Sequence, residues 1–178
     1  MLSRVAAVAT ALVLLVGVAT GCQPEPAPSP SGPVFASEEE AFAAAEETYR
    51  AYVDALNQVD LSDPETFEAV YAWTTGDFAA GERKTFSEMH ADDWTVSGSS
   101  LIARIDNIET QDAFGEVELG ACVDVSSVTL VGADGANQVS PDRPDMQSTR
   151  ISMVASSVSP TGYLIADVVG KELEPPCQ

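Results

Sequence analysis

The chain has 178 residues with 28 acidic and 8 basic side chains, which gives a formal net charge of −20. That charge excludes a nucleic-acid-binding module, because such a module needs a basic surface to replace phosphate counterions. At 45% hydrophobic and 20% charged residues the chain is not broadly disordered. Its length suits one hydrophobic core of ordinary size.

The first 21 residues have the pattern of an export signal. Arg4 supplies a positive start, and an apolar stretch of 14 residues follows from 5 to 18. This stretch is shorter than the roughly 20 residues that a membrane-spanning helix needs. Small residues at 19–21 then precede Cys22.

A cysteine directly after such a run resembles the lipobox of bacterial lipoproteins, although Ala19 stands where that motif usually has leucine. The resemblance implies a signal peptide over residues 1–21 and a diacylglyceryl group on the sulfur of Cys22. Two acyl chains anchor a protein stably, whereas one chain binds a bilayer reversibly. We therefore expect a lipid anchor at the outer face of the plasma membrane. The alternative is an ordinary secretory signal that leaves Cys22 as a free thiol.

Residues 22–36 are predicted to form a tether. Five of the eleven residues from 23 to 33 are proline, which favours extended polyproline II over helix or strand. At roughly 3.1 Å per residue those eleven residues would span on the order of 30 Å.

The folded domain is expected over residues 37–178, beginning with three helices. Ser37 and Glu40 form a capping box ahead of an amphipathic helix over 38–59. Its apolar stripe consists of Phe42, Ala45, Tyr49, Tyr52, Val53, Leu56 and Val59. Asp63 and Pro64 start a second helix that Gly76 would end. A third is expected from Asp77 to about Met89, with Phe78, Phe86 and Met89 inward.

After Trp94 the hydrophobic period changes from that of a helix to that of a strand. Alternation predicts one strand with Leu101, Ala103 and Ile105 inward. It predicts a second with its apolar face formed by Val117, Leu119, Ala121, Val123 and Val125. Turns are expected at 112–115 and 133–135, the latter as a hairpin, and a polar loop at 141–147. Two further strands over 148–158 and 162–170 would complete an antiparallel sheet.

Three helices followed by a curved antiparallel sheet make an α+β domain. The chain resembles the NTF2-like superfamily, and within it small uncharacterised lipoproteins of Gram-positive bacteria. The motifs that carry the resemblance are Tyr-Arg-Ala-Tyr at 49–52, Thr-Thr-Gly at 74–76, Ala-Cys-Val-Asp at 121–124, Gly-Tyr-Leu-Ile at 162–165, and Cys177. The resemblance implies a cone-shaped sheet whose wide end the helices close over a pocket, and it favours a homodimer. Our candidate pocket residues are Tyr49, Tyr52, Tyr71 and Trp94.

Of the three cysteines, one follows the predicted signal peptide and two lie in the expected folded domain. If Cys22 carries lipid, Cys122 and Cys177 remain as a pair in an oxidising compartment, and a disulfide between them is expected. The alternative is two free structural thiols.

No catalytic motif is present, and we expect a protein that is not an enzyme, with no catalytic residue, metal or cofactor. The single His90, near Asp92 and Asp93, is interpreted as a residue at a helix C-terminus. The acidic pairs lack the spacing of a calcium loop, and Asp124 has the wrong parity to face a pocket. The pairs considered were Glu109 with Asp112, Glu116 with Glu118, and Asp142 with Asp145.

The leading hypothesis is a lipoprotein module that binds a small apolar ligand in the pocket, or an envelope protein through the open face of the sheet. A third hypothesis is an assembly factor whose only role is to occupy an envelope complex through its acidic surface. The competing hypothesis is a pocket enzyme of the isomerase or hydrolase type. An enzyme would need a polar group with a displaced pKa deep in an apolar pocket, and a binding module would not.

Overall fold

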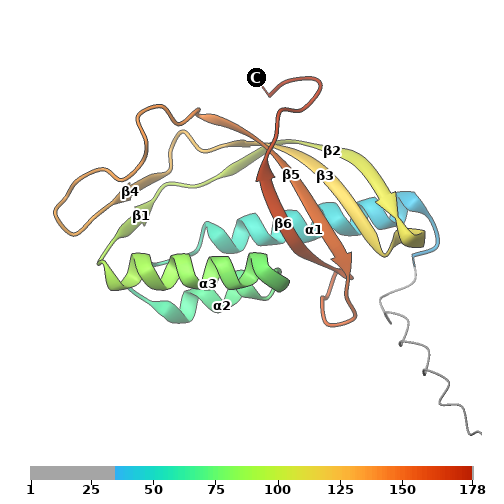
Figure 1. Cartoon of the computed structure of the whole chain (residues 1–178), viewed down its shortest axis with the longest axis horizontal. Coiled ribbons are helices and arrows are strands. Elements are labelled where there is room, and N and C mark those ends of the chain that lie inside the picture. The colour runs from blue at the N-terminus through green and yellow to red at the C-terminus, as the bar shows by residue number, and fades with distance from the viewer. Residues whose placement is uncertain (1–34, 178) are drawn as a thin grey trace, which may run out of the picture.

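The computed structural model describes residues 35–177. The predicted signal peptide, the acylation of Cys22 and nearly all of the predicted tether lie outside these residues. The described part forms an α+β fold in which three helices pack on a curved antiparallel sheet, as expected (Figure 1). Within residues 35–177 no helix has the length and apolar character needed to cross a membrane.

Helix α1 (Glu38–Leu56) begins at the expected capping box. The Glu40 amide donates to Ser37 Oγ at 3.2 Å, and the Glu40 carboxylate accepts from the Ala36 amide at 2.8 Å. The helix ends three residues earlier than predicted, because the Asn57 side chain is bonded to both backbone groups of Ser100. These two bonds tie the end of α1 to the start of the sheet.

The second helix is shorter than predicted and is split in two. A 3-10 turn, η1 (Pro64–Phe67), is capped by Asp63 and leads into α2 (Glu68–Tyr71). The chain then becomes extended, and residues 73–75 bond to the edge of the sheet at Ile165. Gly76 therefore does not end the second helix. With φ +60° it starts α3 (Gly76–Ala91).

The main sheet has the order β2-β3-β5-β6, with every neighbouring pair antiparallel. Its strands are β2 (Leu101–Gln111), β3 (Glu116–Asp124), β5 (Met146–Ala155) and β6 (Tyr163–Gly170). A short 3-10 turn, η2 (Asp112–Phe114), joins β2 to β3. The strands β1 (Thr95–Ser97) and β4 (Thr129–Val131) form a separate two-stranded sheet. The turn at 133–135 follows β4 and closes a short hairpin, as predicted, with an antiparallel bridge between Val131 and Asn137. The strand that pairs with β4 along its length is β1.

The predicted inward face of β3 is confirmed, and Leu119 and Ala121 are completely buried. The predicted face of β2 is wrong at its start, because Leu101 is 62% exposed and Ile102 packs on the core instead. A bulge between Ile102 and Arg104 causes this difference, since one extra residue reverses the side-chain alternation.

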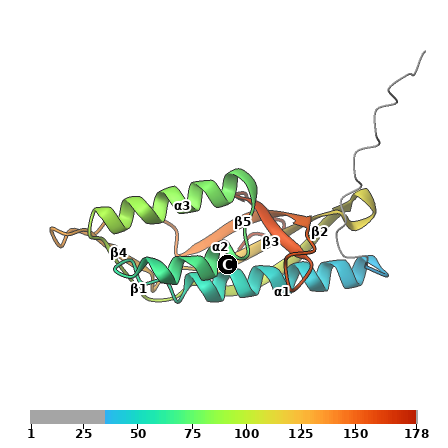
Figure 2. The same ribbon diagram turned by 90° about the horizontal axis from the view of Figure 1, so that it is seen from below.

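The core lies between α1 and the concave face of the sheet. Its largest fully buried side chains are Tyr163, Leu119, Ile151, Met153 and Ile165. Helices α1 and α3 both extend along the long axis of the molecule (Figure 2). They differ in packing, because α1 buries a full stripe whereas Ala79 is the one buried residue of α3.

Candidate functional site

A hollow of about 790 Å³ opens between α1, α3 and β6. We call it the α3 groove. Its apolar wall is formed by Tyr52, Leu56, Phe78, Gly81, Phe86 and Ala166, and its polar wall by Asp77, Glu82, Thr85 and Asp167. An apolar concavity with a few converging polar groups is the usual form of a small-molecule site.

Glu82 is the central polar group of the groove. Tyr52 donates its hydroxyl proton to Glu82 Oε1 at 2.7 Å. The other carboxylate oxygen, Oε2, is buried and accepts no hydrogen bond of normal geometry within residues 35–177. Burial raises the pKa of Glu82, although the hydrogen bond from Tyr52 opposes that rise. The site therefore has a partly desolvated carboxyl that can accept a proton or a hydrogen bond from a ligand.

Tyr52 remains a hydrogen-bond donor to this carboxyl. Its burial raises its pKa, and the negative charge of Glu82 raises it further. The two side chains come from α1 and α3, so their bond joins the two helices across the groove.

A second hollow of about 360 Å³ adjoins the first below β1 and β4. We call it the β1–β4 hollow. Leu56 and Phe86 line both spaces. The remaining wall contains no charged residue and consists of Asn57, Val59, Leu61, Met89, Val96, Ser97, Gly98, Ser100, Val128 and Leu130.

Of the four pocket residues predicted from the sequence, Tyr52 alone lines the α3 groove. Tyr49 is 4% exposed and belongs to the core, where burial raises its pKa. Tyr71 lies below the guanidinium of Arg83, which is 4.5 Å from the ring centre. Trp94 is half-buried just after α3. Tyr52 is also buried, at 7% exposed, so it belongs to the same stripe of α1 as Tyr49 and in addition borders the groove.

Sequence reasoning missed Glu82. The signal was the spacing on α3, where Phe78, Glu82 and Phe86 follow one another at steps of four and so share one helix face. A single carboxylate between two inward aromatic residues is unusual on such a face.

The other polar candidates take structural roles. His90 Nδ1 bonds to the Leu61 carbonyl oxygen at 2.7 Å, and Phe67 packs edge-on against its ring. Glu118 pairs with Arg150 at 2.8 Å. Asp124 accepts the Ser126 amide at 2.9 Å, and hydrogen bonds from Ser126 lower its pKa. In the part of the chain that the structure describes, no cluster of potential ligands could hold a metal ion.

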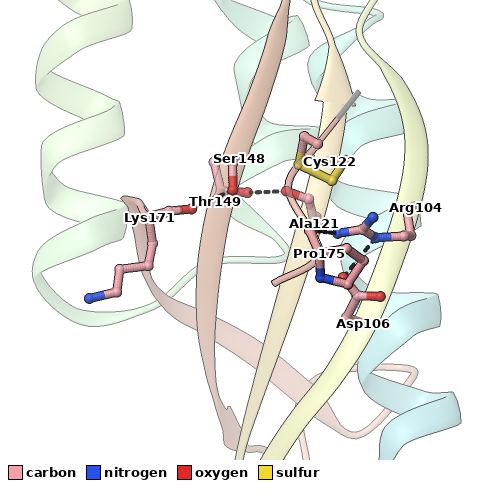
Figure 3. Close-up of polar contacts among 9 residues, drawn as sticks. Arg104, Asp106, Ala121, Cys122, Ser148, Thr149, Lys171 and Pro175 are labelled. Carbon is pink, nitrogen blue, oxygen red and sulfur yellow. Dashed lines mark hydrogen bonds and ion pairs between the residues drawn. A yellow bond between two sulfur atoms is a disulfide. The ribbon is translucent and has the colours of Figure 1, made fainter. Parts of the chain in front are cut away.

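The expected pair of cysteines is bonded in the structure, with Cys122 and Cys177 Cα atoms 5.5 Å apart. The bond holds the C-terminal tail against the face of the sheet opposite α1 (Figures 1 and 3). Arg104 donates to the Pro175 carbonyl and to Asp106. Leu173 lies over Gly120, where a β-carbon would be 2.9 Å from Leu173 Cδ2. The tail therefore covers part of the sheet face that we expected to be open.

No family model matches the chain, and no curated protein matches it significantly. Solved structures do match. The intermembrane space region of the chloroplast protein ARC6 aligns with TM-score 0.50 and 12% identity, covering 72% of this chain and 94% of that one. CagV, a VirB8 homolog of the type IV secretion system of Helicobacter pylori, aligns with TM-score 0.46 and 11% identity over 74% and 98%. Aln2 from a Streptomyces species aligns with TM-score 0.43 and 16% identity over 75% and 90%.

At these identities the likeness shows the fold alone. Together with the helices packed on a curved antiparallel sheet, it confirms the expected NTF2-like fold. A fold of this kind does not define an activity, so the function has to be argued from the groove.

The buried carboxyl gives a prediction for stability. The pKa of Glu82 is higher in the folded state than its usual value of 4.5, so its ionisation destabilises the fold as pH rises through the folded-state pKa. Glu82→Gln keeps an acceptor for Tyr52 and removes the charge. We expect it to raise the free energy of unfolding at pH 7 by up to about 1 kcal/mol, a figure discounted for partial exposure.

Urea denaturation at several pH values measures this effect, and the advantage of the variant should vanish below about pH 4. Glu88→Gln, on the exposed side of the same helix, is the control. It should change stability by less than about 0.5 kcal/mol at any pH. A destabilised Glu82→Gln protein at pH 7 would contradict the interpretation.

Proposed function

We propose that this protein is an extracytoplasmic lipoprotein, anchored through acylated Cys22, that binds a small, largely apolar ligand in the α3 groove. The observation that carries the binding role is the apolar wall of the groove with a partly desolvated carboxyl in it. The disulfide between Cys122 and Cys177 supports the location, because such bonds persist in oxidising compartments. Kinship with small lipoproteins of Gram-positive bacteria is part of the same proposal.

Filling the groove tests the binding role. A β-carbon added at Gly81 on the groove wall would meet no atom within 4 Å, so Gly81→Leu can occupy the space without straining α3. We expect the folded domain to bind the neutral fluorescent probe N-phenyl-1-naphthylamine, and Gly81→Leu to weaken that binding by about tenfold, equivalent to about 1.4 kcal/mol.

Ala80→Leu is the matched control, because Ala80 is the preceding residue of α3, is exposed, and does not line the groove. It adds a larger apolar side chain to the same helix and should leave probe binding unchanged. If Gly81→Leu binds the probe as tightly as the unaltered chain, the groove is not the binding site.

The anchor is tested on the full chain in its own membrane. Cys22→Ser should move the protein from the membrane fraction to the soluble fraction, and intact mass should report the added diacylglyceryl group on the unaltered chain. A chain that stays in the membrane after this substitution would contradict acylation at Cys22. The expected homodimer stays a prediction, which the molecular mass of the domain in solution would decide.

An enzyme on the same fold is the second candidate. It is favoured by Glu82 and Tyr52, since a carboxyl with a raised pKa in an apolar pocket suits general acid–base chemistry. Native mass spectrometry of the unaltered chain and of Glu82→Gln separates the two functions. If the protein is an enzyme that uses Glu82 as its acid or base, the unaltered chain should retain the product and the Glu82→Gln variant should retain the substrate. A binding module should retain the same molecule in both.

A further inference from the structure

The charged groups that line the α3 groove all carry one sign. Asp77, Glu82 and Asp167 come from two different elements and border the same space. None of the residues that the structure describes on this wall is basic. The nearby cations of α3 do not line the groove: Arg83 lies over the Tyr71 ring, although its charge lowers the pKa of Glu82, and Lys84 pairs with Glu88. The groove therefore offers acceptors and negative charge to a ligand.

The aromatic residues of the groove reinforce this preference. The rings of Tyr52 and Phe78 are 6.2 Å apart and tilted by 55°, and Phe86 lies on the same wall. Aromatic faces attract cations through their quadrupole and also pack against apolar groups. Tyr52 contributes both its ring and the hydroxyl bond that fixes Glu82.

Unsatisfied oxygen atoms also point to a missing donor. Glu82 Oε2 and Thr74 Oγ1 are both buried without a hydrogen-bond partner of normal geometry within residues 35–177. A side-chain hydrogen bond from Thr74 lowers the pKa of Glu82, so the two side chains lie near each other, although no pair of their atoms has normal hydrogen-bond geometry. Buried polar atoms are almost always paired in folded proteins. A ligand N–H group would supply Glu82 Oε2 with a donor of normal geometry.

The neighbouring space has the opposite character. The β1–β4 hollow has no charged residue in its wall, and Leu56 and Phe86 separate it from the acidic end. The two spaces thus form a polar end and an apolar end on either side of one pair of side chains. A ligand that fits both must itself be amphipathic.

We propose that the α3 groove and the β1–β4 hollow together bind a cationic amphiphile, with its ammonium group among Asp77, Glu82 and Asp167 and its hydrocarbon chain extending past Leu56 and Phe86. This inference rests on the proposed binding function and adds the charge and the orientation of the ligand. Pairing with the cation would offset part of the cost of desolvating the Glu82 carboxylate.

Calorimetric titration of the folded domain with three amphiphiles of equal chain length tests the inference. The probes are dodecylammonium, dodecyl maltoside and dodecyl sulfate, each below its micelle concentration. We expect dodecylammonium to bind at least tenfold more tightly than dodecyl maltoside, and dodecyl sulfate to bind most weakly. Butylammonium should bind far more weakly than dodecylammonium, because its chain is too short to reach the β1–β4 hollow.

Two variants that each remove one negative charge distinguish the groove from the acidic surface in general. Glu82→Gln should weaken dodecylammonium binding much more than dodecyl maltoside binding, and so remove most of the preference for the cation. Asp142→Asn, in an exposed loop outside the groove wall, should change neither. An equal loss of cation binding in both variants would overturn the inference, because it would assign the binding to overall charge.

The remaining outcomes separate this inference from the proposed function. If dodecyl maltoside binds as tightly as dodecylammonium and Gly81→Leu blocks both, the groove is a binding site but its ligand is not cationic. If none of the three probes binds, the proposed function and the inference fail together.

Discussion

Replacing Cys122 and Cys177 together by alanine is expected to lower the free energy of unfolding by about 4 kcal/mol. The disulfide closes a loop across a sequence separation of 55 residues, and the chain-entropy model gives this value for a loop of that length. A domain of this size has only about 5–15 kcal/mol of stability in total. The loss should therefore appear as a large shift of the urea midpoint.

Alanine is the appropriate replacement because Cys122 is buried and a serine hydroxyl there would lack a partner. Leu173→Ala, in the unaltered disulfide-bonded chain, is the companion variant. It removes the side chain that lies over Gly120 but keeps the covalent bond, and it should cost less, about 2 kcal/mol. A double alanine variant within about 1 kcal/mol of the unaltered chain would show that the tail contacts alone hold this region.

Tyr163→Ala is expected to lower the free energy of unfolding by about 3–5 kcal/mol, since it removes a large aromatic side chain that is fully buried. Tyr163 begins β6 and packs face to face on Phe35, with ring centres 4.9 Å apart and planes 4° from parallel. Its hydroxyl donates to the Phe114 carbonyl oxygen at 2.6 Å. One side chain thus joins the chain entry, the β2–β3 turn and the last strand.

Tyr163→Phe separates the two contributions, because it keeps the ring and removes the hydroxyl. We expect it to cost about 1–2 kcal/mol through the unpaired Phe114 carbonyl. Urea denaturation followed by circular dichroism measures both variants. If Tyr163→Ala unfolds at the same urea concentration as Tyr163→Phe, ring packing is not what stabilises this end of the domain.

Local patterns in the sequence predicted a structural feature correctly where that feature depends on a single helix or strand. The Ser37 cap and the alternating face of β3 follow from nearest neighbours along the chain, and both appear as expected. Errors arose where a distant contact intervened. The bulge in β2 exposes Leu101, and the bonds from residues 73–75 to Ile165 end the second helix early. Such tertiary contacts override local propensity.

The candidate site could be predicted only in part for the same reason. Tyr52 was among the candidate pocket residues and lines the groove, but its partner Glu82 lies 30 residues further along the chain and on another helix. The helical period places Glu82 beside Phe78 and Phe86, yet it does not show which side chain of another element contacts the Glu82 carboxylate. That information comes from the way α1 and α3 flank β6, which depends on the whole fold.

The stacking of Phe35 on Tyr163 fixes where the chain enters the domain. This entry lies at the start of α1, and Tyr52 lies about 20 Å further along that helix, towards the end where β1 and β4 stand (Figure 1). Any segment before Phe35 therefore joins the elongated domain at one end, and the groove opens nearer to the other end. If that segment ends in a membrane anchor, the domain is attached to the bilayer at the end where α1 begins. The α3 groove would then lie nearer to the end of the domain that is farther from that attachment point.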